Sequence, residues 1–230
     1  MVILFFKDLL KLLNENRQFP NYAAERRVDI FINYFLADIV SARYGQEVVY
    51  VAPEFPLKKC DKQTDEAEKV KTNLQSDKLD YLCMFKNTKQ PIFIELKTDV
   101  NSFSKNQAEN YVKHARSWPK CIDRLKKIIY APGMRKDYKI KYSFLLKRLL
   151  DLGVVGFDSA KSMNATWKGA AEILYLIPTS KSLYSDITNV SHGSIKILQF
   201  SAIKWLNTKL TTGYGEEYQH LLGFLESISR

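Results

Sequence analysis

Two apolar runs separated by four residues most constrain the fold of this chain. The runs "KLDYLCMFK" (78–86) and "PIFIELK" (91–97) are rich in β-favouring residues, and the polar link "NTKQ" is short enough for a hairpin. Pro91 fits the first position of a strand, because proline has no N–H to donate to the ladder. The sequence therefore predicts two antiparallel strands in which the numbers of opposed residues sum to about 175–177.

Helix and strand patterns on both sides of this hairpin predict an α/β fold. Residues 22–44 carry apolar side chains at helical spacing and are followed by Gly45, which suits a helix C-terminus. Residues 47–57 look like a strand that runs into a Pro-broken loop. Further helices are expected at 104–118, 119–129, 137–151, 201–211 and 215–228, and further strands at 171–179 and 194–200.

The order of these elements indicates the layers of the fold. A helix, three strands, helices, two strands and helices predict a central mixed sheet flanked by helices. We find no repeat and no clear linker, so one domain is expected over 1–230, with its core at about 20–200 and C-terminal helices over 201–230. A chain of 230 residues that is 46% hydrophobic can bury a core of that size.

Positive charge is concentrated in one part of the chain. Residues 113–148 hold twelve Lys and Arg against Asp123 and Asp137, and this segment accounts for the whole formal charge of +10. Such a field indicates a polyanionic partner, with nucleic acid first and an anionic membrane surface second. A solvated basic face that only keeps the protein in solution is the alternative.

Cysteine usage and hydropathy favour a cytoplasmic protein without a membrane segment. Cys60, Cys83 and Cys121 are odd in number and lack CxxC spacing, which argues against a disulfide framework and a structural zinc site. The apolar start "MVILFFKDLLKLL" is interrupted by Lys7 and Lys11 and is too short to span a bilayer. We expect it to form an amphipathic helix rather than a signal peptide.

An acid and a base stand one residue apart near the end of the second hairpin strand. Side chains two positions apart on a strand share a face, so Glu95 and Lys97 point the same way. On the first hairpin strand, Asp80 stands between apolar neighbours, and its number and that of Glu95 sum to 175. The hairpin therefore predicts two adjacent carboxylates and a lysine on one face.

Two neighbouring carboxylates in a sheet favour a bound cation. They repel each other and are costly to remove from water. A divalent ion resolves both problems, and Mg²⁺ (or Mn²⁺) prefers hard oxygen ligands, here Asp80, Glu95 and the main-chain carbonyl of Leu96. A lysine beside such an ion, here Lys97, can position a water, and the whole arrangement suits phosphodiester hydrolysis.

The spacing of these residues resembles the motif of the PD-(D/E)XK nuclease superfamily. Asp80 is followed by fourteen residues and then by Glu95-Leu96-Lys97, although Leu79 stands where a proline usually precedes the aspartate. The resemblance implies a restriction-endonuclease-like core of helix, three strands, helix and strand. It also implies a Mg²⁺-dependent nuclease that acts on nucleic acid, with DNA as the expected substrate.

The helix after the hairpin adds a second part of the resemblance. "IELKTD" is similar to the strand of RecB-type members, which carry Gln-x-x-x-Tyr on the next helix, and "QAENY" supplies Gln107 and Tyr111. These two residues lie on one helical face, since they are four positions apart. In the family's arrangement they would contact a DNA phosphate or steady Lys97.

Members of the family often have a further acid on the first core helix. The apolar stripe of residues 22–44 consists of Val28, Ile32, Phe35, Leu36 and Ile39. At 100° per residue, Glu25 lies about 20° from Ile32, in the middle of this stripe. A glutamate that faces a core needs a partner or a metal, so Glu25 is a further candidate ligand. Asp29, about 60° away, is the reserve candidate.

Each candidate also has a simpler interpretation. Glu95 and Lys97 can be surface charges, and Tyr111 can be a core residue. Gln107 can be exposed, and Glu25 can pair with Arg26 or Arg27. Asp77 is an alternative to Asp80, although it precedes the strand proper. Glu54, between prolines, is more typical of a loop carboxylate than of a ligand.

Aromatic residues alternate with Lys and Arg in "KDYKIKYSFLLKR" (136–148). Tyr142 and Phe144 are expected in the core by default, whereas aromatic side chains among cations can also stack nucleic-acid bases.

A metal-dependent nuclease is the function that these residues favour. The alternatives are a nuclease-fold module that binds nucleic acid without turnover, and a peripheral membrane or scaffold protein that uses the basic face. Restriction, repair and defence roles are open, as is a homo-oligomeric state.

Overall fold

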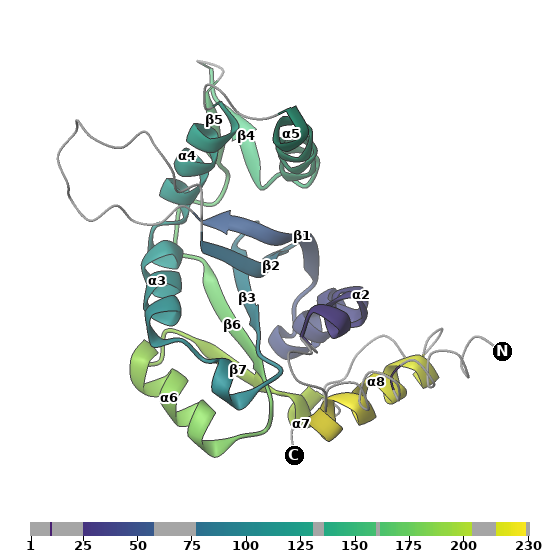
Figure 1. Ribbon diagram of the computed structural model, residues 1–230. Coiled ribbons are helices and arrows are strands. Elements are labelled where there is room, and N and C mark those ends of the chain that lie inside the picture. The colour runs from purple at the N-terminus through teal and green to yellow at the C-terminus, as the bar shows by residue number, and fades with distance from the viewer. Residues whose placement is uncertain are drawn as a thin grey trace. The chain divides into compact units, whose positions relative to one another are not determined.

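The computed structural model of the protein describes residues 10, 25–57, 77–130, 136–159, 162–203 and 215–228 (Figure 1). The predicted N-terminal helix (apart from Leu10), the polar segment 60–76 and most of the expected helix 201–211 lie outside these residues. In the described part, no helix is long and apolar enough to cross a membrane.

A five-stranded mixed sheet forms the centre of the fold, with strand order β1-β2-β3-β6-β7. Its strands are β1 (Val48–Leu57), β2 (Asp77–Phe85), β3 (Pro91–Leu96), β6 (Glu172–Ile177) and β7 (Lys196–Gln199). The pair β2–β3 is antiparallel, whereas β6–β7 is parallel. The prediction of an α/β protein with a mixed sheet flanked by helices is confirmed.

The described helices are close to those expected from the sequence, with two additions. They are α2 (Glu25–Tyr44), α3 (Lys105–Arg116), α4 (Trp118–Ile129), α5 (Lys136–Asp151), α6 (Lys181–Ser191), α7 (Phe200–Ile203), α8 (Gly215–Ile228) and the 3-10 helix η1 (Val100–Ser102). Gly45 follows α2 with φ of +64°, the left-handed conformation that glycine adopts at helix ends. The two additions are α6 and the short η1, which the sequence analysis missed.

The chain divides into two compact units. The first unit comprises 1–50, 95–104 and 174–230, and the second comprises 51–94 and 105–173. Strands β1, β3 and β6 each contribute residues to both units. The expectation of one domain over 1–230 stays a prediction.

In the first unit, two aromatic side chains join helices α2 and α8. Phe35 of α2 packs against Tyr218 of α8 with ring centroids 5.4 Å apart. The predicted stripe is buried where its side chains are described, at Ile32, Phe35, Leu36 and Ile39. Helix α6 connects the parallel strands β6 and β7, as a crossover must.

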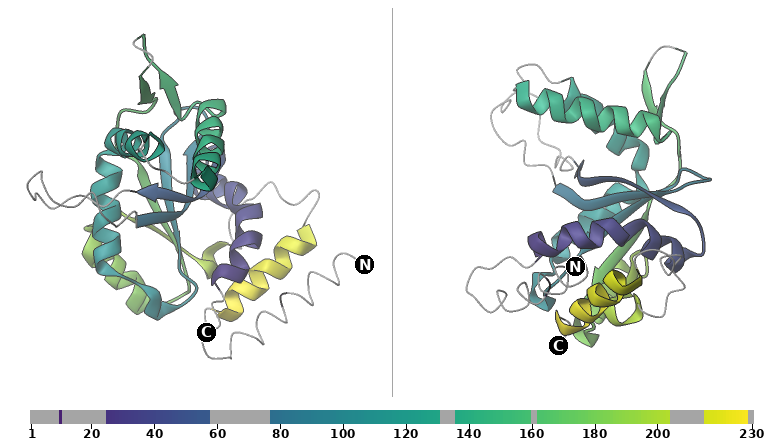
Figure 2. Two further views of the ribbon diagram at one scale, coloured as in Figure 1. Left: turned by 45° about the horizontal axis from the view of Figure 1, so that its top comes forward. Right: turned by 90° about the vertical axis from the view of Figure 1, so that its right-hand side faces the viewer.

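In the second unit, Trp118 at the start of α4 is fully buried and packs against two aromatic rings. Its ring centroid lies 5.8 Å from that of Phe55 on β1 and 5.8 Å from that of Phe93 on β3. A two-stranded hairpin that the sequence analysis also missed, β4 (Val155–Phe157) with β5 (Met163–Ala165), packs against α4 and α5 (Figure 2).

Strand β1 continues through two prolines, so the expected Pro-broken loop is wrong. The strand includes Pro53 and Pro56 and ends at Leu57. It can do so because β1 is an edge strand of the sheet, where missing N–H donors are tolerated. Glu54, between the two prolines, has φ of 44° and an exposed side chain.

Candidate functional site

Glu95 and Lys97 form a buried ion pair at the end of β3. Lys97 Nζ donates a hydrogen bond of 2.5 Å to Glu95 Oε1, and the exposed fractions of the two residues are only 6% and 2%. The prediction that they share one face of the strand is confirmed, whereas surface charges at a strand end are not what is observed. Burial in the sheet also removes both charges from water, which makes this pair energetically expensive.

Backbone contacts hold this pair in place. The Lys97 N–H donates to the Leu176 carbonyl on β6 at 2.9 Å, so the chain beyond β3 stays tied to the sheet. Leu96, between the two charged residues, is 1% exposed. Because side chains alternate along a strand, the packed Leu96 side chain fixes the direction of its charged neighbours.

The hairpin register agrees with the predicted one. The opposed residues are Tyr81 with Ile94, Leu82 with Phe93, Cys83 with Ile92 and Met84 with Pro91, and each pair of numbers sums to 175. These pairs end one position short of Asp80 and Glu95. The predicted approach of those two carboxylates therefore stays a prediction.

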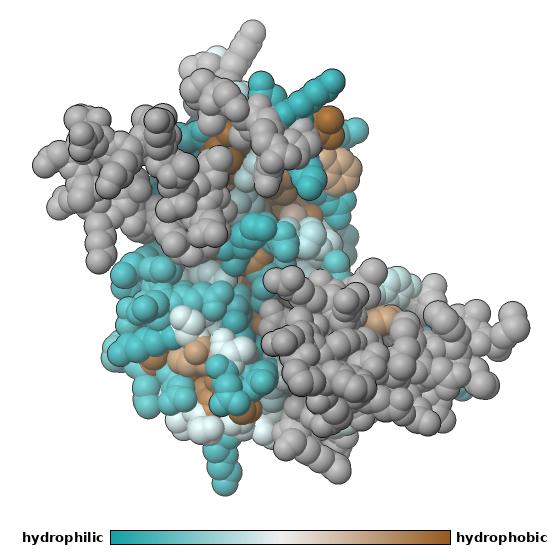
Figure 3. All heavy atoms as spheres, in the orientation of Figure 1, coloured by the Kyte–Doolittle hydropathy of each residue, from teal (hydrophilic) through white to brown (hydrophobic). Residues whose placement is uncertain are grey.

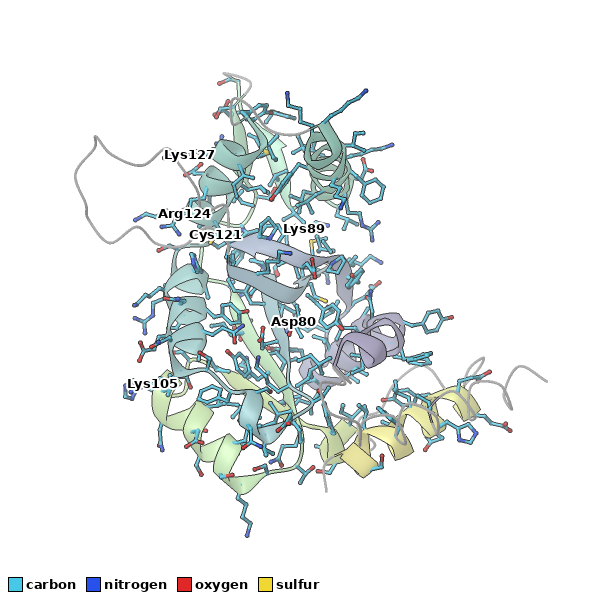
Figure 4. All side chains as sticks on the ribbon, in the orientation of Figure 1. Asp80, Lys89, Lys105, Cys121, Arg124 and Lys127 are labelled. Carbon is cyan, nitrogen blue, oxygen red and sulfur yellow. The ribbon has the colours of Figure 1, made fainter. Side chains whose placement is uncertain are left out.

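Asp80 is half-buried on β2, and Figure 4 labels it among the strands. The preceding residue, Leu79, is fully buried, and the strand is buried on both faces from Tyr81 to Phe85. The alternative candidate Asp77 begins β2, and its side chain lies outside the described residues. Asp80 therefore keeps the position on the strand that the sequence predicted for it.

Gln107 and Tyr111 contact each other on α3, as their spacing predicts. Gln107 Nε2 donates to the Tyr111 hydroxyl at 2.8 Å, and that hydroxyl donates to the main-chain carbonyl of Lys78 at 2.6 Å. Tyr111 is fully buried, so the simpler interpretation as a core residue is confirmed, but with a satisfied polar end. This chain of hydrogen bonds ties α3 to β2 two residues before Asp80.

Replacing Tyr111 by phenylalanine is expected to lower the free energy of unfolding by about 1–2 kcal/mol, because the Lys78 carbonyl and the Gln107 amide each lose a hydrogen bond in a partly buried place. Urea denaturation measures the change. The matched control is Tyr184→Phe on α6, where the side chain is 47% exposed and the loss should stay below about 0.5 kcal/mol. Equal stability of the two variants would contradict an anchoring role for the Tyr111 hydroxyl.

The remaining carboxylate candidates differ in how far the structure describes them. Glu25 begins α2, and its side chain and that of Asp29 lie outside the described residues, so the role of Glu25 stays a prediction. Glu54 is exposed and pairs with Lys78 at a distance of 2.9 Å. Glu54 therefore behaves as an ordinary surface carboxylate.

The predicted donor set fits a hard divalent cation in its chemistry. Two carboxylates and a main-chain carbonyl are oxygen ligands of the kind that Mg²⁺ takes, usually with several waters completing the shell. Among the described residues, no group of three or more His, Cys, Asp and Glu side chains is arranged to hold a metal ion.

The basic segment 113–148 presents most of its cations to solvent. The exposed members are Lys113, Arg116, Lys120, Lys127, Lys136, Lys139, Lys141, Lys147 and Arg148. Figure 4 labels Lys105, Arg124 and Lys127 on helices α3 and α4. Lys126 pairs with Asp123 at 3.0 Å, which neutralises part of the charge of α4.

His114 is a buried residue rather than a surface one. It is 1% exposed, and its Nδ1 lies 3.0 Å from Arg124 Nη1 of α4. An arginine N–H can only donate, so Nδ1 accepts this hydrogen bond. Sequence reasoning missed this contact between α3 and α4, because no spacing rule relates residues on two separate helices.

The described cysteines are buried thiols. Cys83 on β2 and Cys121 on α4 form no disulfide, and Cys60 lies outside the described residues. Burial raises the pKa of the Cys83 thiol far above its usual value, against a smaller lowering by a hydrogen bond with the Val51 backbone. Cys83 is therefore held as an unreactive thiol in the core.

Comparison with known proteins gives no identification: no family model, no curated protein and no solved structure matches this chain.

Proposed function

We propose that the protein is a metal-dependent phosphodiester hydrolase that cleaves nucleic acid, with DNA as the expected substrate. The observation that carries this proposal is the buried ion pair of Glu95 and Lys97, with Nζ and Oε1 2.5 Å apart at the end of a sheet strand. Apolar residues of similar size would stabilise such a position at least as well as two charges. A buried acid and base side by side at the end of a strand can instead serve a chemical task.

The register of the hairpin supports the second carboxylate. Extending the pairs that sum to 175 by one position would bring Asp80 opposite Glu95. Opposed residues of an antiparallel pair are close enough for their carboxylates to share one ion. Asp80, Glu95 and the Leu96 carbonyl would hold Mg²⁺ or Mn²⁺, with Glu25 assisting.

Lys97 has the central role among the chain's own residues. Its ammonium would orient the attacking water toward the phosphorus and offset negative charge that develops on the phosphoryl oxygens. The chemistry that Mg²⁺ supplies in such sites is a lowered pKa of bound water and further charge stabilisation. Gln107 and Tyr111 would support Lys97 or the scissile phosphate, and the basic segment 113–148 would hold the phosphate backbone.

The order of elements supports the resemblance to the PD-(D/E)XK superfamily. The chain runs through α2, β1, β2, β3, α3 and later β6, which is the helix, three-strand, helix and strand order of that core. Membership of this family is part of the proposal, as is a cytoplasmic location.

Cleavage of plasmid DNA and of labelled DNA and RNA oligonucleotides, with and without Mg²⁺ or Mn²⁺, tests the proposal. Cleavage should require the metal and be lost in Asp80→Asn. Metal binding is measured separately, as a rise in the unfolding temperature with Mn²⁺ that Asp80→Asn lacks. Metal-independent cleavage, or full activity of Asp80→Asn, would contradict the assignment.

A binding module without turnover is the second candidate, and the exposed cations of 113–148 favour it equally. It predicts salt-sensitive binding of nucleic acid with no cleavage under any metal condition. Binding together with metal-dependent cleavage would exclude it.

A further inference from the structure

Helix α5 and the elements packed against it expose four large apolar side chains. Ile140 and Phe144 of α5 are 65% and 74% exposed, Tyr130 after α4 is 66% exposed, and Phe157 of β4 is 55% exposed. Helix α4 and strand β4 both pack against α5. In Figure 3, hydrophobic side chains lie open to solvent among hydrophilic ones over α5, at the upper right. A group of this kind marks an interaction site more often than scattered single residues do.

The outer face of α5 combines these apolar residues with cations. At 100° per residue, Ile140 lies about 40° from Phe144 on the helix. Four cations lie within about 80° of Phe144: Lys136, Lys141, Lys147 and Arg148. All four of these residues are exposed to solvent. One exposed acid with a described side chain, Asp151, lies on this face at the C-terminal end of α5. The described side chains of this face therefore carry a net positive charge around an apolar centre.

The opposite face of α5 packs into the core, so Phe144 is not exposed merely because the helix is unpacked. Leu149 is fully buried, and Tyr142 and Leu146 are half-buried, so the helix already has a face for its own core. The expectation that Phe144 is a core residue is wrong, because Phe144 lies on the other side of the helix. A phenylalanine that the core does not use is available to a partner.

Charge and aromatic content together favour nucleic acid as that partner. The cations match a phosphate backbone, and three of the four exposed apolar residues (Tyr130, Phe144 and Phe157) carry an aromatic ring on which a base can stack. In a duplex the bases stack on one another, so such rings have bases to contact only where a strand is single. A membrane surface would be served as well by aliphatic side chains, which form a minority here.

We propose that the outer face of α5, with Tyr130 and Phe157, binds single-stranded nucleic acid by stacking bases on aromatic rings between phosphate contacts. The inference rests on the proposed function only in taking nucleic acid as the partner. It narrows the substrate to single strands, or to duplexes with single-stranded ends or gaps. Binding is measured in EDTA, which removes divalent metal ions and so prevents metal-dependent cleavage. Failure of the proposed cleavage and failure of the proposed stacking are therefore seen in separate measurements.

Fluorescence anisotropy with the full chain and a labelled oligothymidylate of about 20 nucleotides tests the proposal, with a duplex of equal length alongside. The single strand should bind more tightly than the duplex. Phe144→Ala should weaken single-strand binding roughly 5- to 100-fold, the range for loss of one stacked base. Tyr184→Ala on α6, a matched exposed aromatic residue, should leave affinity unchanged.

A second variant separates stacking from simple apolar contact. Phe144→Leu keeps an apolar side chain but removes the ring, so it should lose nearly as much single-strand affinity as Phe144→Ala. Because Phe144 is exposed, both variants should keep the unfolding temperature of the wild type. Replacing Lys136 and Lys147 by glutamine should reduce the slope of log affinity against log salt by about 1.4, since each lost phosphate contact removes about 0.7.

Three results would overturn the proposal. The first is wild-type affinity of Phe144→Ala for the single strand. The second is binding of anionic phosphatidylserine vesicles that depends on Phe144 while single-strand binding does not, which would assign the face to a membrane. The third is a dimer in light scattering that Phe144→Ala dissociates without any change in single-strand binding, which would assign it to a second copy of the chain.

Discussion

Replacing Lys97 by methionine is expected to lower the rate of metal-dependent cleavage by about 10²–10³-fold, because the variant lacks the charge that would offset the developing negative charge on the phosphate in the proposed mechanism. Affinity for the nucleic acid, measured in EDTA, should change by less than about threefold, since the other exposed cations of segment 113–148 would still contact the phosphate backbone. Single-turnover cleavage of a labelled oligonucleotide measures the rate, and anisotropy measures the affinity. Methionine has nearly the length of the lysine hydrocarbon chain, so it fills most of the space that the Lys97 side chain occupies.

Lys181→Met is the control for this result. Lys181 is exposed at the start of α6, in the same unit as Lys97, and its loss should leave the rate unchanged. A Lys97→Met variant that folds and cleaves at the wild-type rate would remove Lys97 from the mechanism. In that case Glu95 and Lys97 would be a structural ion pair.

The same substitution is also expected to lower the free energy of unfolding by about 3–5 kcal/mol, because it leaves the Glu95 carboxylate buried without its ammonium partner. The side chains of Lys97 and Glu95 are only 7% and 2% exposed, so water cannot replace that partner. The double variant Glu95→Gln/Lys97→Met carries no buried charge and should regain roughly 2 kcal/mol relative to Lys97→Met. Urea denaturation of the wild type, both single variants and the double variant measures this coupling.

The double variant also separates loss of chemistry from loss of fold. It should be more stable than Lys97→Met and equally inactive, because it lacks both the carboxylate and the amine of the proposed site. Additive losses in the two single variants, with no recovery in the double variant, would mean that the charges do not stabilise each other in the folded protein.

Local sequence patterns were sufficient to predict the centre of the candidate site. The hairpin of β2 and β3 was predictable, because two β-favouring runs with a short polar link can pair in few registers, and the observed register is one of them. The contact between Glu95 and Lys97 and the contact between Gln107 and Tyr111 were predictable for the same kind of reason. Residues two apart on a strand, or four apart on a helix, are neighbours whatever the rest of the chain does.

Short elements were missed although one of them carries local signals. Helix α6 has Ser180 as its N-cap, whose side chain accepts from the Leu183 N–H, and Leu183 and Ile187 as buried residues at helical spacing. Its apolar stripe is too short to stand out from the polar residues around it. The three-residue strands β4 and β5 have no periodicity that could be recognised, and their pairing depends on their packing against α4 and α5.

The sequence by itself determined the α/β class, the hairpin with its register, and the placement of an acid and a lysine on one face of β3, because these depend on chain neighbours and on the period of each element. Only the tertiary structure decided that Glu95 and Lys97 are buried, that the Tyr111 hydroxyl reaches the Lys78 carbonyl, and that Phe144 faces solvent. Burial and long-range hydrogen bonds depend on which elements pack together, and no local pattern along the chain specifies that.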